Sequence, residues 1–236
     1  MRRLSATFAI LVLCAVAASG RMTEVKPGLE FEDSGRGNDI LWFDDIEGNV
    51  DGWHSVSFVS WGCGRFHLDT YMAYEDTYSW WCGCFDYDSN GGYGNSWDER
   101  LNMPIVDWTG YVYPVLTYAF RCDSEAGYDF TYVQAESSGS FVNLNRGYDG
   151  SQPWFDLGLY GFVVRRHDNP FVGRFRFMSD GWWSDEDGLY CSTGGAFMVD
   201  NIRLYDYYTG HTFFLDDCES GGLCWPESPW TPCSWW

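Results

Sequence analysis

Two stretches of the chain, one near each end, repeat an acidic pattern in which Asp-Asp-x-Glu is followed six residues later by a Trp. The first copy contains Asp45 and Glu47, and the second contains Asp217 and Glu219. Side chains two positions apart share a face in an extended strand, so each pair of carboxylates projects to one side. Adjacent carboxylates repel each other unless a positive charge lies between them, and hard cations prefer oxygen ligands. The pattern therefore predicts calcium binding, with a solvated acidic turn as the alternative.

Two other acidic segments could hold a calcium ion, each with a plain hydrated turn as the alternative. Residues 86–91 match the first half of an EF-hand-type loop, although the twelfth position is Trp97 and not the bidentate Glu that such a loop needs. Residues 180–188 place four carboxylates within nine residues. The weaker metal candidates from these two segments are Asp86, Asp88, Asp180, Asp185 and Asp187.

Several tryptophans lie in Gly- and Asp-rich stretches near these carboxylates. Aromatic faces can stack on sugar rings while neighbouring carboxylates accept hydrogen bonds from sugar hydroxyls. Where two tryptophans are adjacent in a strand, one of them must point away from the core. We therefore expect a carbohydrate-binding surface, with core packing as the alternative for each indole. The candidate ligand-binding residues are Trp80, Trp81, Trp97, Trp182 and Trp183.

Motifs of two common hydrolase classes are absent from the sequence. The chain contains neither the Gly-x-Ser-x-Gly of serine hydrolases nor the His-Glu-x-x-His of zinc peptidases. A glycosidase needs only two carboxylates held about 5 to 10 Å apart, so the 34 acidic residues leave that activity open. The sequence predicts a non-catalytic protein, with a secreted glycosidase or peptidase as the alternative.

The N-terminus and the charge predict an exported protein that avoids polyanions. Arg2 and Arg3 precede an apolar run, so residues 1–20 are typical of a secretory signal peptide, and residues 21–38 are typical of a linker. The formal net charge of -20 disfavours nucleic acid and anionic membranes as partners and favours cations. Of the nine cysteines, all but Cys14 lie outside the signal and could form disulfides. We expect a secreted, extracellular protein with no membrane span after signal removal.

Short strands must position these side chains. Short runs of apolar residues, or of apolar and polar residues in alternation, are separated by Gly, Asp, Asn and Pro. No long segment after the signal has apolar residues at the spacing of one helix face. In Arg174–Met178, Phe175 and Phe177 share one face and the arginines share the other, as in a half-buried antiparallel sheet. The sequence therefore predicts an all-β fold, an antiparallel β-sandwich of jelly-roll type with long Gly- and Trp-rich loops, over residues 39–208.

Short motifs within residues 41–205 resemble MAM-type and choice-of-anchor-J-type jelly rolls. Asp45-Ile46-Glu47 followed by Gly52-Trp53 resembles their opening strand, although these families prefer Phe at the position of Ile46. Gly195 to Ile202 is similar to their closing strand. In such families the two strands lie together and commonly hold a structural calcium ion. The resemblance therefore implies a site made by Asp45, Glu47 and Asp200.

The same resemblance implies a function. Similar modules accompany exported bacterial metallopeptidases of the immune-inhibitor-A type. It implies a calcium-stabilised adhesion or substrate-binding module within a larger secreted protein, with an extracellular glycan or protein and a peptidase domain as partners.

The second copy of the acidic pattern lies in residues 209–236, which are too short to close a core alone. We expect this segment to begin a second, truncated repeat. The alternative is that it packs back on the first domain through Cys218, Cys224 and Cys233.

Overall fold

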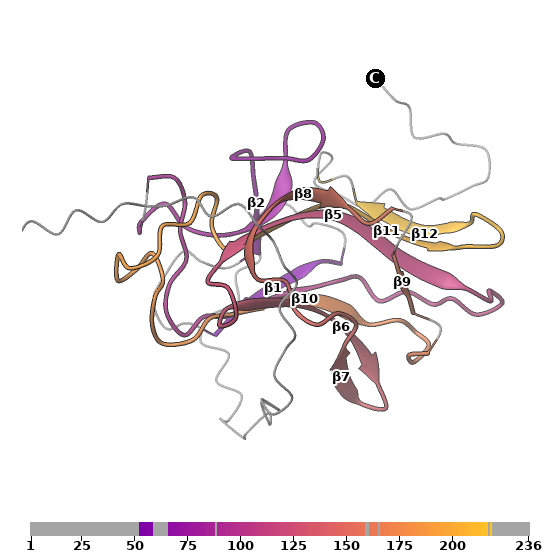
Figure 1. Cartoon of the computed structure of the whole chain (residues 1–236). Helices are drawn as coiled ribbons and strands as arrows, with labels where there is room; N and C mark the ends of the chain where they lie inside the picture. The colour runs from indigo at the N-terminus through magenta and orange to yellow at the C-terminus, as the bar shows by residue number, and fades with distance from the viewer. Residues whose placement is uncertain are drawn as a thin grey trace, which may run out of the picture.

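The protein is described by a computed structural model, which covers residues 52–58, 66–87, 89–158, 161–164, 166–216 and 218. The regular secondary structure of this part consists of strands, arranged in two antiparallel sheets that face each other (Figure 1). The predicted antiparallel β-sandwich is confirmed. Within the described ranges, the structure contains no helix that is long and apolar enough to cross a membrane.

One sheet has five strands in the order β1-β4-β10-β6-β7. Its strands are β1 (His54–Ser57), β4 (Asp98–Asn102), β10 (Gly173–Met178), β6 (Phe130–Ser137) and β7 (Ser140–Asn143). In β10, Phe175 and Phe177 are buried in the core. Arg176 lies on the opposite face, where it pairs with Asp98 at 2.8 Å. The alternation predicted for this strand is therefore confirmed.

The other sheet has seven strands, with β2-β3-β11-β5-β8 as its main order. Its strands are β2 (Phe66–Asp69), β3 (Ser79–Cys82), β11 (Phe197–Asp206), β5 (Pro114–Ser124), β8 (Gly150–Asp156), β9 (Phe162–Val163) and β12 (Thr212–Asp216). Along one edge of β11, Phe197–Val199 pairs with β3 and the later residues pair with β12. An irregularity in the pairing of β11 with β5 separates the two halves.

The pairing of β12 corrects the expected domain boundary. Residues 212–216, which we expected to begin a second repeat after residue 208, add a strand to the first sandwich. They pack back on the first domain through backbone pairing rather than through a bridge from Cys218, which is a buried thiol without a disulfide. Cys224 and Cys233 lie outside the described residues.

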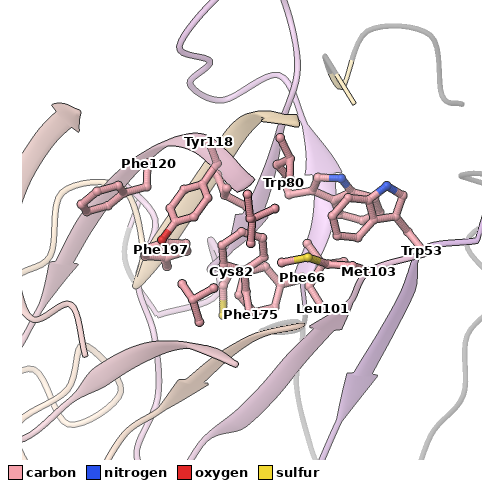
Figure 2. Packing of buried hydrophobic residues seen from close by; sticks show 14 of the residues in the cluster. Trp53, Phe66, Trp80, Cys82, Leu101, Met103, Tyr118, Phe120, Phe175 and Phe197 are labelled. Atoms are coloured by element: carbon pink, nitrogen blue, oxygen red, sulfur yellow. The ribbon is translucent and has the colours of Figure 1, made fainter. Parts of the chain in front are cut away.

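Aromatic side chains fill the space between the sheets, as Figure 2 shows from close by. Phe120 and Phe197 stack with ring centroids 5.8 Å apart, and Tyr118 meets Phe175 of the opposite sheet edge-on at 5.0 Å. Both geometries are favoured by the charge distribution of aromatic rings. The large rings supply the apolar burial that holds the two sheets together.

We expect Phe197→Ala to lower the free energy of unfolding by about 3–5 kcal/mol, because it leaves a cavity in a packed core. Phe155→Ala is the matched control, because Phe155 also contacts Phe120 but is 50% exposed on β8. Phe155→Ala should lower the free energy of unfolding by only about 1 kcal/mol. Urea unfolding of both variants checks this. Equal losses would contradict the placement of Phe197 at the centre of the core.

Candidate functional site

Two long loops meet at one end of the sandwich. Residues 83–97 connect β3 to β4, and residues 179–196 connect β10 to β11. Figure 1 shows the two loops side by side at the left, in purple to magenta and in orange. The Asn95 amide donates a hydrogen bond to the Glu186 carboxylate at 2.8 Å, which ties one loop to the other. We call residues 179–196 the tryptophan loop.

Asp185 is the buried anchor of the tryptophan loop. Its carboxylate accepts hydrogen bonds from the amide of Tyr93 at 3.0 Å and from the amide and hydroxyl of Ser192 at 2.7 and 2.8 Å. A Cβ atom added at Gly92 would lie 2.7 Å from the Asp185 Cβ, so the close approach requires a glycine there. Asp185, a weaker metal candidate, therefore serves as an acceptor for loop amides.

A cluster of three carboxylates lies beside this anchor. Glu125 and Asp129 come from the β5–β6 turn, and Asp180 comes from the start of the tryptophan loop. One ligand oxygen from each residue lies within 4.8 Å of the others. Asp129 is fully buried and accepts hydrogen bonds from the Tyr93 hydroxyl at 2.6 Å and from the Asp180 amide at 2.8 Å. We call Glu125, Asp129 and Asp180 the acidic triad.

Two carboxyl groups of the acidic triad, those of Glu125 and Asp129, have raised pKa values. Burial, reinforced by the charges of Asp129, Asp180 and Asp187, raises the pKa of Glu125 to about 7. Burial also raises the pKa of Asp129 to about 6, although its hydrogen bonds from Tyr93 and from backbone amides act in the opposite direction. Above these values the cluster carries repelling negative charges, which favours a bound cation or a bound hydrogen-bond donor.

Two adjacent indoles project from the tryptophan loop into solvent. Trp182 is 72% exposed and Trp183 is 53% exposed. The Trp182 amide donates to Asp180 at 2.9 Å, and the Trp183 amide donates to Asp187 at 3.0 Å. Asp187 also accepts a hydrogen bond from the Asn95 side chain at 3.2 Å. The exposed rings are therefore held on a hydrogen-bonded backbone, next to carboxylate and amide groups.

The backbone of Trp183 has a φ of 66°. This left-handed conformation is rare for a bulky side chain and costs about 1–2 kcal/mol. Gly or Asn adopts the left-handed backbone at a lower cost than Trp, so either residue at position 183 would make the loop more stable. The presence of a large exposed aromatic ring here is thus not explained by folding.

The structure corrects the expectation for the other three tryptophans. Trp80, Trp81 and Trp97 are 1%, 1% and 2% exposed, so their rings belong to the packed interior and have no face open to a ligand. The Trp80 indole donates to Asp216 at 3.0 Å, and the Trp81 indole donates to the Gly194 carbonyl at 2.8 Å. Of the five candidate tryptophans, Trp182 and Trp183 are the ones that the structure exposes.

The expected calcium clamp between the ends of the domain is only partly described. The Asp200 carboxylate accepts hydrogen bonds from the amides of Tyr74, Glu75 and Asn201 at 2.9, 3.3 and 2.7 Å. It therefore anchors the loop between β2 and β3, and burial raises its pKa to about 6. The remaining members of the predicted sites that lie outside the described residues are Asp45, Glu47 and Asp88.

The acidic triad contains one predicted residue and two that were not predicted. Asp180 was a weaker metal candidate, whereas Glu125 and Asp129 belong to residues 123–129, an acidic stretch with three carboxylates that was not predicted to bind a metal. Within the described part of the chain, Asp86, Asp185 and Asp187 join no cluster of three metal-type ligands. Asp86 is exposed at the surface, and Asp187 organises the tryptophan loop.

No protein-family model matches the chain, and no curated protein matches it significantly. Among solved structures, the chain is similar to the family 11 carbohydrate-binding module of the cellulosomal cellulase Lic26A-Cel5E of Clostridium thermocellum. The sequence identity is 19%, the TM-score is 0.29, and the match covers 69% of this chain and 92% of that module. A likeness at this level carries no argument about a ligand. The resemblance to MAM-type and choice-of-anchor-J-type jelly rolls stays a prediction.

The raised pKa of Glu125 predicts a pH-dependent stability. A carboxyl whose pKa is higher in the folded state than its ordinary 4.5 favours folding while it is protonated, so stability falls as the pH rises from about 4.5 to 7. We expect Glu125→Gln to raise the urea midpoint at pH 8 and to change it little at pH 5, in EDTA. Glu136→Gln, at the other end of β6, is the control. A Glu125→Gln effect that is equal at both pH values would contradict the prediction.

Proposed function

We propose that this chain is a non-catalytic, extracellular binding module that takes carbohydrate on the tryptophan loop. The observation that carries the proposal is the pair of solvent-exposed indoles at Trp182 and Trp183, on a backbone fixed by Asp180 and Asp187. Rigid aromatic rings beside hydrogen-bonding groups suit a ligand that offers both a flat apolar face and hydroxyl groups. Sugars have this combination.

The chemistry around the indoles narrows the class of sugar. The formal net charge of the chain is -20, so an anionic polysaccharide would be repelled during approach. Glu186 and Asp187 beside the indoles would accept hydrogen bonds from hydroxyl groups. Two rings are also too small a surface for a stable protein interface, which buries about 800 Å² on each partner. A neutral polysaccharide is therefore the ligand class that this loop favours.

The acidic triad gives the module a candidate calcium site. Its donor atoms are carboxylate oxygens, the type that Ca²⁺ prefers, and within the described residues no Lys or Arg forms a salt bridge with them. The Tyr93 hydroxyl and the Asp180 amide donate to different oxygens of Asp129, and a carboxylate has about four lone-pair sites, so acceptor capacity remains for a metal. An ion held by Glu125, Asp129 and Asp180 would neutralise their repulsion and join the β5–β6 turn to the tryptophan loop. The expected peptidase partner stays a prediction.

One observation favours a second candidate function, glycoside hydrolysis. A carboxyl group with a pKa of about 7, such as Glu125, has the value expected of a general acid beside ionised carboxylates. The test is to incubate the protein with a panel of neutral polysaccharides and to measure reducing ends. Release that Glu125→Gln abolishes would establish a hydrolase. Binding without release supports the non-catalytic function.

We expect Trp182→Ala to weaken polysaccharide binding about tenfold or more, because it removes an exposed stacking ring. Affinity electrophoresis in gels containing soluble β-glucan, xylan, glucomannan or galactan measures the loss of retardation. Trp183→Asn should weaken binding similarly and leave the free energy of unfolding unchanged or higher by up to about 1 kcal/mol, because Asn tolerates the left-handed backbone. Val142→Ala, a 40% exposed apolar residue on β7, is the control. Unchanged binding in both tryptophan variants would refute the proposed site.

We expect millimolar Ca²⁺ to raise the thermal midpoint by several degrees, because a ligand that binds only the folded state stabilises it. EDTA should reverse the shift. Asp180→Asn should remove the response without unfolding the protein, because Asp180 is exposed. Differential scanning calorimetry of both proteins with and without Ca²⁺ checks this. A midpoint that does not respond to Ca²⁺ would show that the described triad holds no calcium.

A further inference from the structure

A second group of aromatic side chains lies at the end of the sandwich opposite the tryptophan loop. It surrounds the turn between β11 and β12, at the far right of Figure 1, where β5 also begins. Tyr207 and Tyr208 in this turn are 63% and 70% exposed. We call this group the tyrosine platform; its members are Tyr111, Tyr113, Tyr207, Tyr208 and His211.

A buried carboxylate fixes the backbone beneath the tyrosine platform. Asp206 is 1% exposed. One of its oxygens accepts hydrogen bonds from the amides of Val112 and Tyr113 at 3.2 and 2.7 Å. The other accepts from the amide and the hydroxyl of Thr209 at 3.0 and 2.9 Å. The loop before β5 and the turn after β11 are thereby held to one side chain.

The rings of the platform support one another. The Tyr113 ring lies 5.8 Å from that of Tyr207 and 5.5 Å from that of Tyr208, and the last two are 5.6 Å apart. Tyr111 stacks on His211 with ring centroids 4.6 Å apart and an interplanar angle of 11°. Because these contacts limit the rotamers, a ligand that stacks on the exposed rings would immobilise little more than is already fixed.

The fold itself does not require aromatic residues in this turn. Asp206, Thr209 and Gly210 close the turn through their own hydrogen bonds, including the Gly210 amide to the Asp206 carbonyl at 2.8 Å. Small polar residues usually occupy such positions. Two large, mostly exposed phenol rings at Tyr207 and Tyr208 are therefore better explained by a ligand than by stability.

We propose that the tyrosine platform is a second binding site for neutral polysaccharide, so that one chain can hold two polymer segments at once. Charge favours a sugar over another copy of the chain, because two chains of formal net charge -20 would repel each other. Each exposed phenol offers a ring face together with a hydroxyl that donates and accepts hydrogen bonds. The platform stands on its own contacts; only the bivalency rests on the proposed function of the tryptophan loop.

The test measures polysaccharide binding after removing the exposed rings of the tyrosine platform or of the tryptophan loop separately. Affinity electrophoresis in gels containing soluble β-glucan, xylan, glucomannan or galactan first identifies the retarding polymer, the one that slows the unmodified chain. The variant Tyr207→Ser/Tyr208→Ser should bind this polymer about tenfold more weakly. The matched variant Tyr207→Phe/Tyr208→Phe keeps the rings and should bind within about threefold of the unmodified chain. Urea unfolding of both variants should give unchanged midpoints, since both side chains are exposed.

Bivalency has a readout of its own. The unmodified chain should raise the viscosity of a dilute solution of the retarding polymer, because it joins separate strands. Tyr207→Ser/Tyr208→Ser and Trp182→Ala should each still bind while losing this crosslinking. The two variants combined should not bind.

The outcomes separate the two proposals. If Trp182→Ala abolishes binding and Tyr207→Ser/Tyr208→Ser leaves it unchanged, the platform is not a sugar site, whereas the proposed function stands. If only the tyrosine variant loses binding, the platform is the sugar site and the tryptophan loop is not. A tyrosine variant that changes the sedimentation coefficient but not polymer binding would identify a contact between chains and overturn the inference. Retardation by none of the four polymers would overturn both proposals.

Discussion

Buried carboxylates that accept hydrogen bonds from loop backbones are the interaction on which this structure depends. Acidic residues outnumber basic ones 34 to 14, so ion pairs such as that of Asp98 with Arg176 cannot serve most of them. Backbone amides serve instead as the hydrogen-bond donors to many of these carboxylates. Asp185, Asp200 and Asp206 each receive hydrogen bonds from segments distant in sequence. A net negative charge is therefore compatible with long ordered loops, because each loop brings its own donors to a fixed acceptor.

This arrangement determines where function can reside. The sandwich core is made of aromatic rings from both sheets and is filled, so the loops at the two ends are the parts that can present a binding surface. At each end a fixed aspartate orders a loop that exposes aromatic rings: Asp187 beneath Trp183, and Asp206 beside Tyr207. A site built in this way loses little conformational entropy when it binds a ligand.

The sequence predicted those features that depend on local periodicity. The alternation of Phe175 and Phe177 with arginines was sufficient to place β10, and turn residues separated the strands. In β3 one of the two adjacent tryptophans does point away from the core, as expected for a strand, but its ring is still not exposed to solvent. The outer ring, Trp81, is covered by Tyr71 and Phe85, whose centroids lie 5.2 and 4.8 Å away. Both covering rings come from the loops that directly precede and follow β3, and whether such a loop folds back over its strand has no periodic signal in the sequence. The acidic triad was missed for the same reason, because Glu125 and Asp180 meet only when β5 and β10 end on the same side of the sandwich.

Several features that cost stability lie in the tryptophan loop and the turn beside it. Trp183 holds a left-handed backbone, two indoles face water, and the charges of the acidic triad repel one another above about pH 7. By contrast, the buried carboxylate of Asp206 accepts hydrogen bonds from Val112, Tyr113 and Thr209. Strain, exposed rings and repelling charges occur together in this loop and turn, and a ligand that contacted the rings and the charges would offset part of their cost.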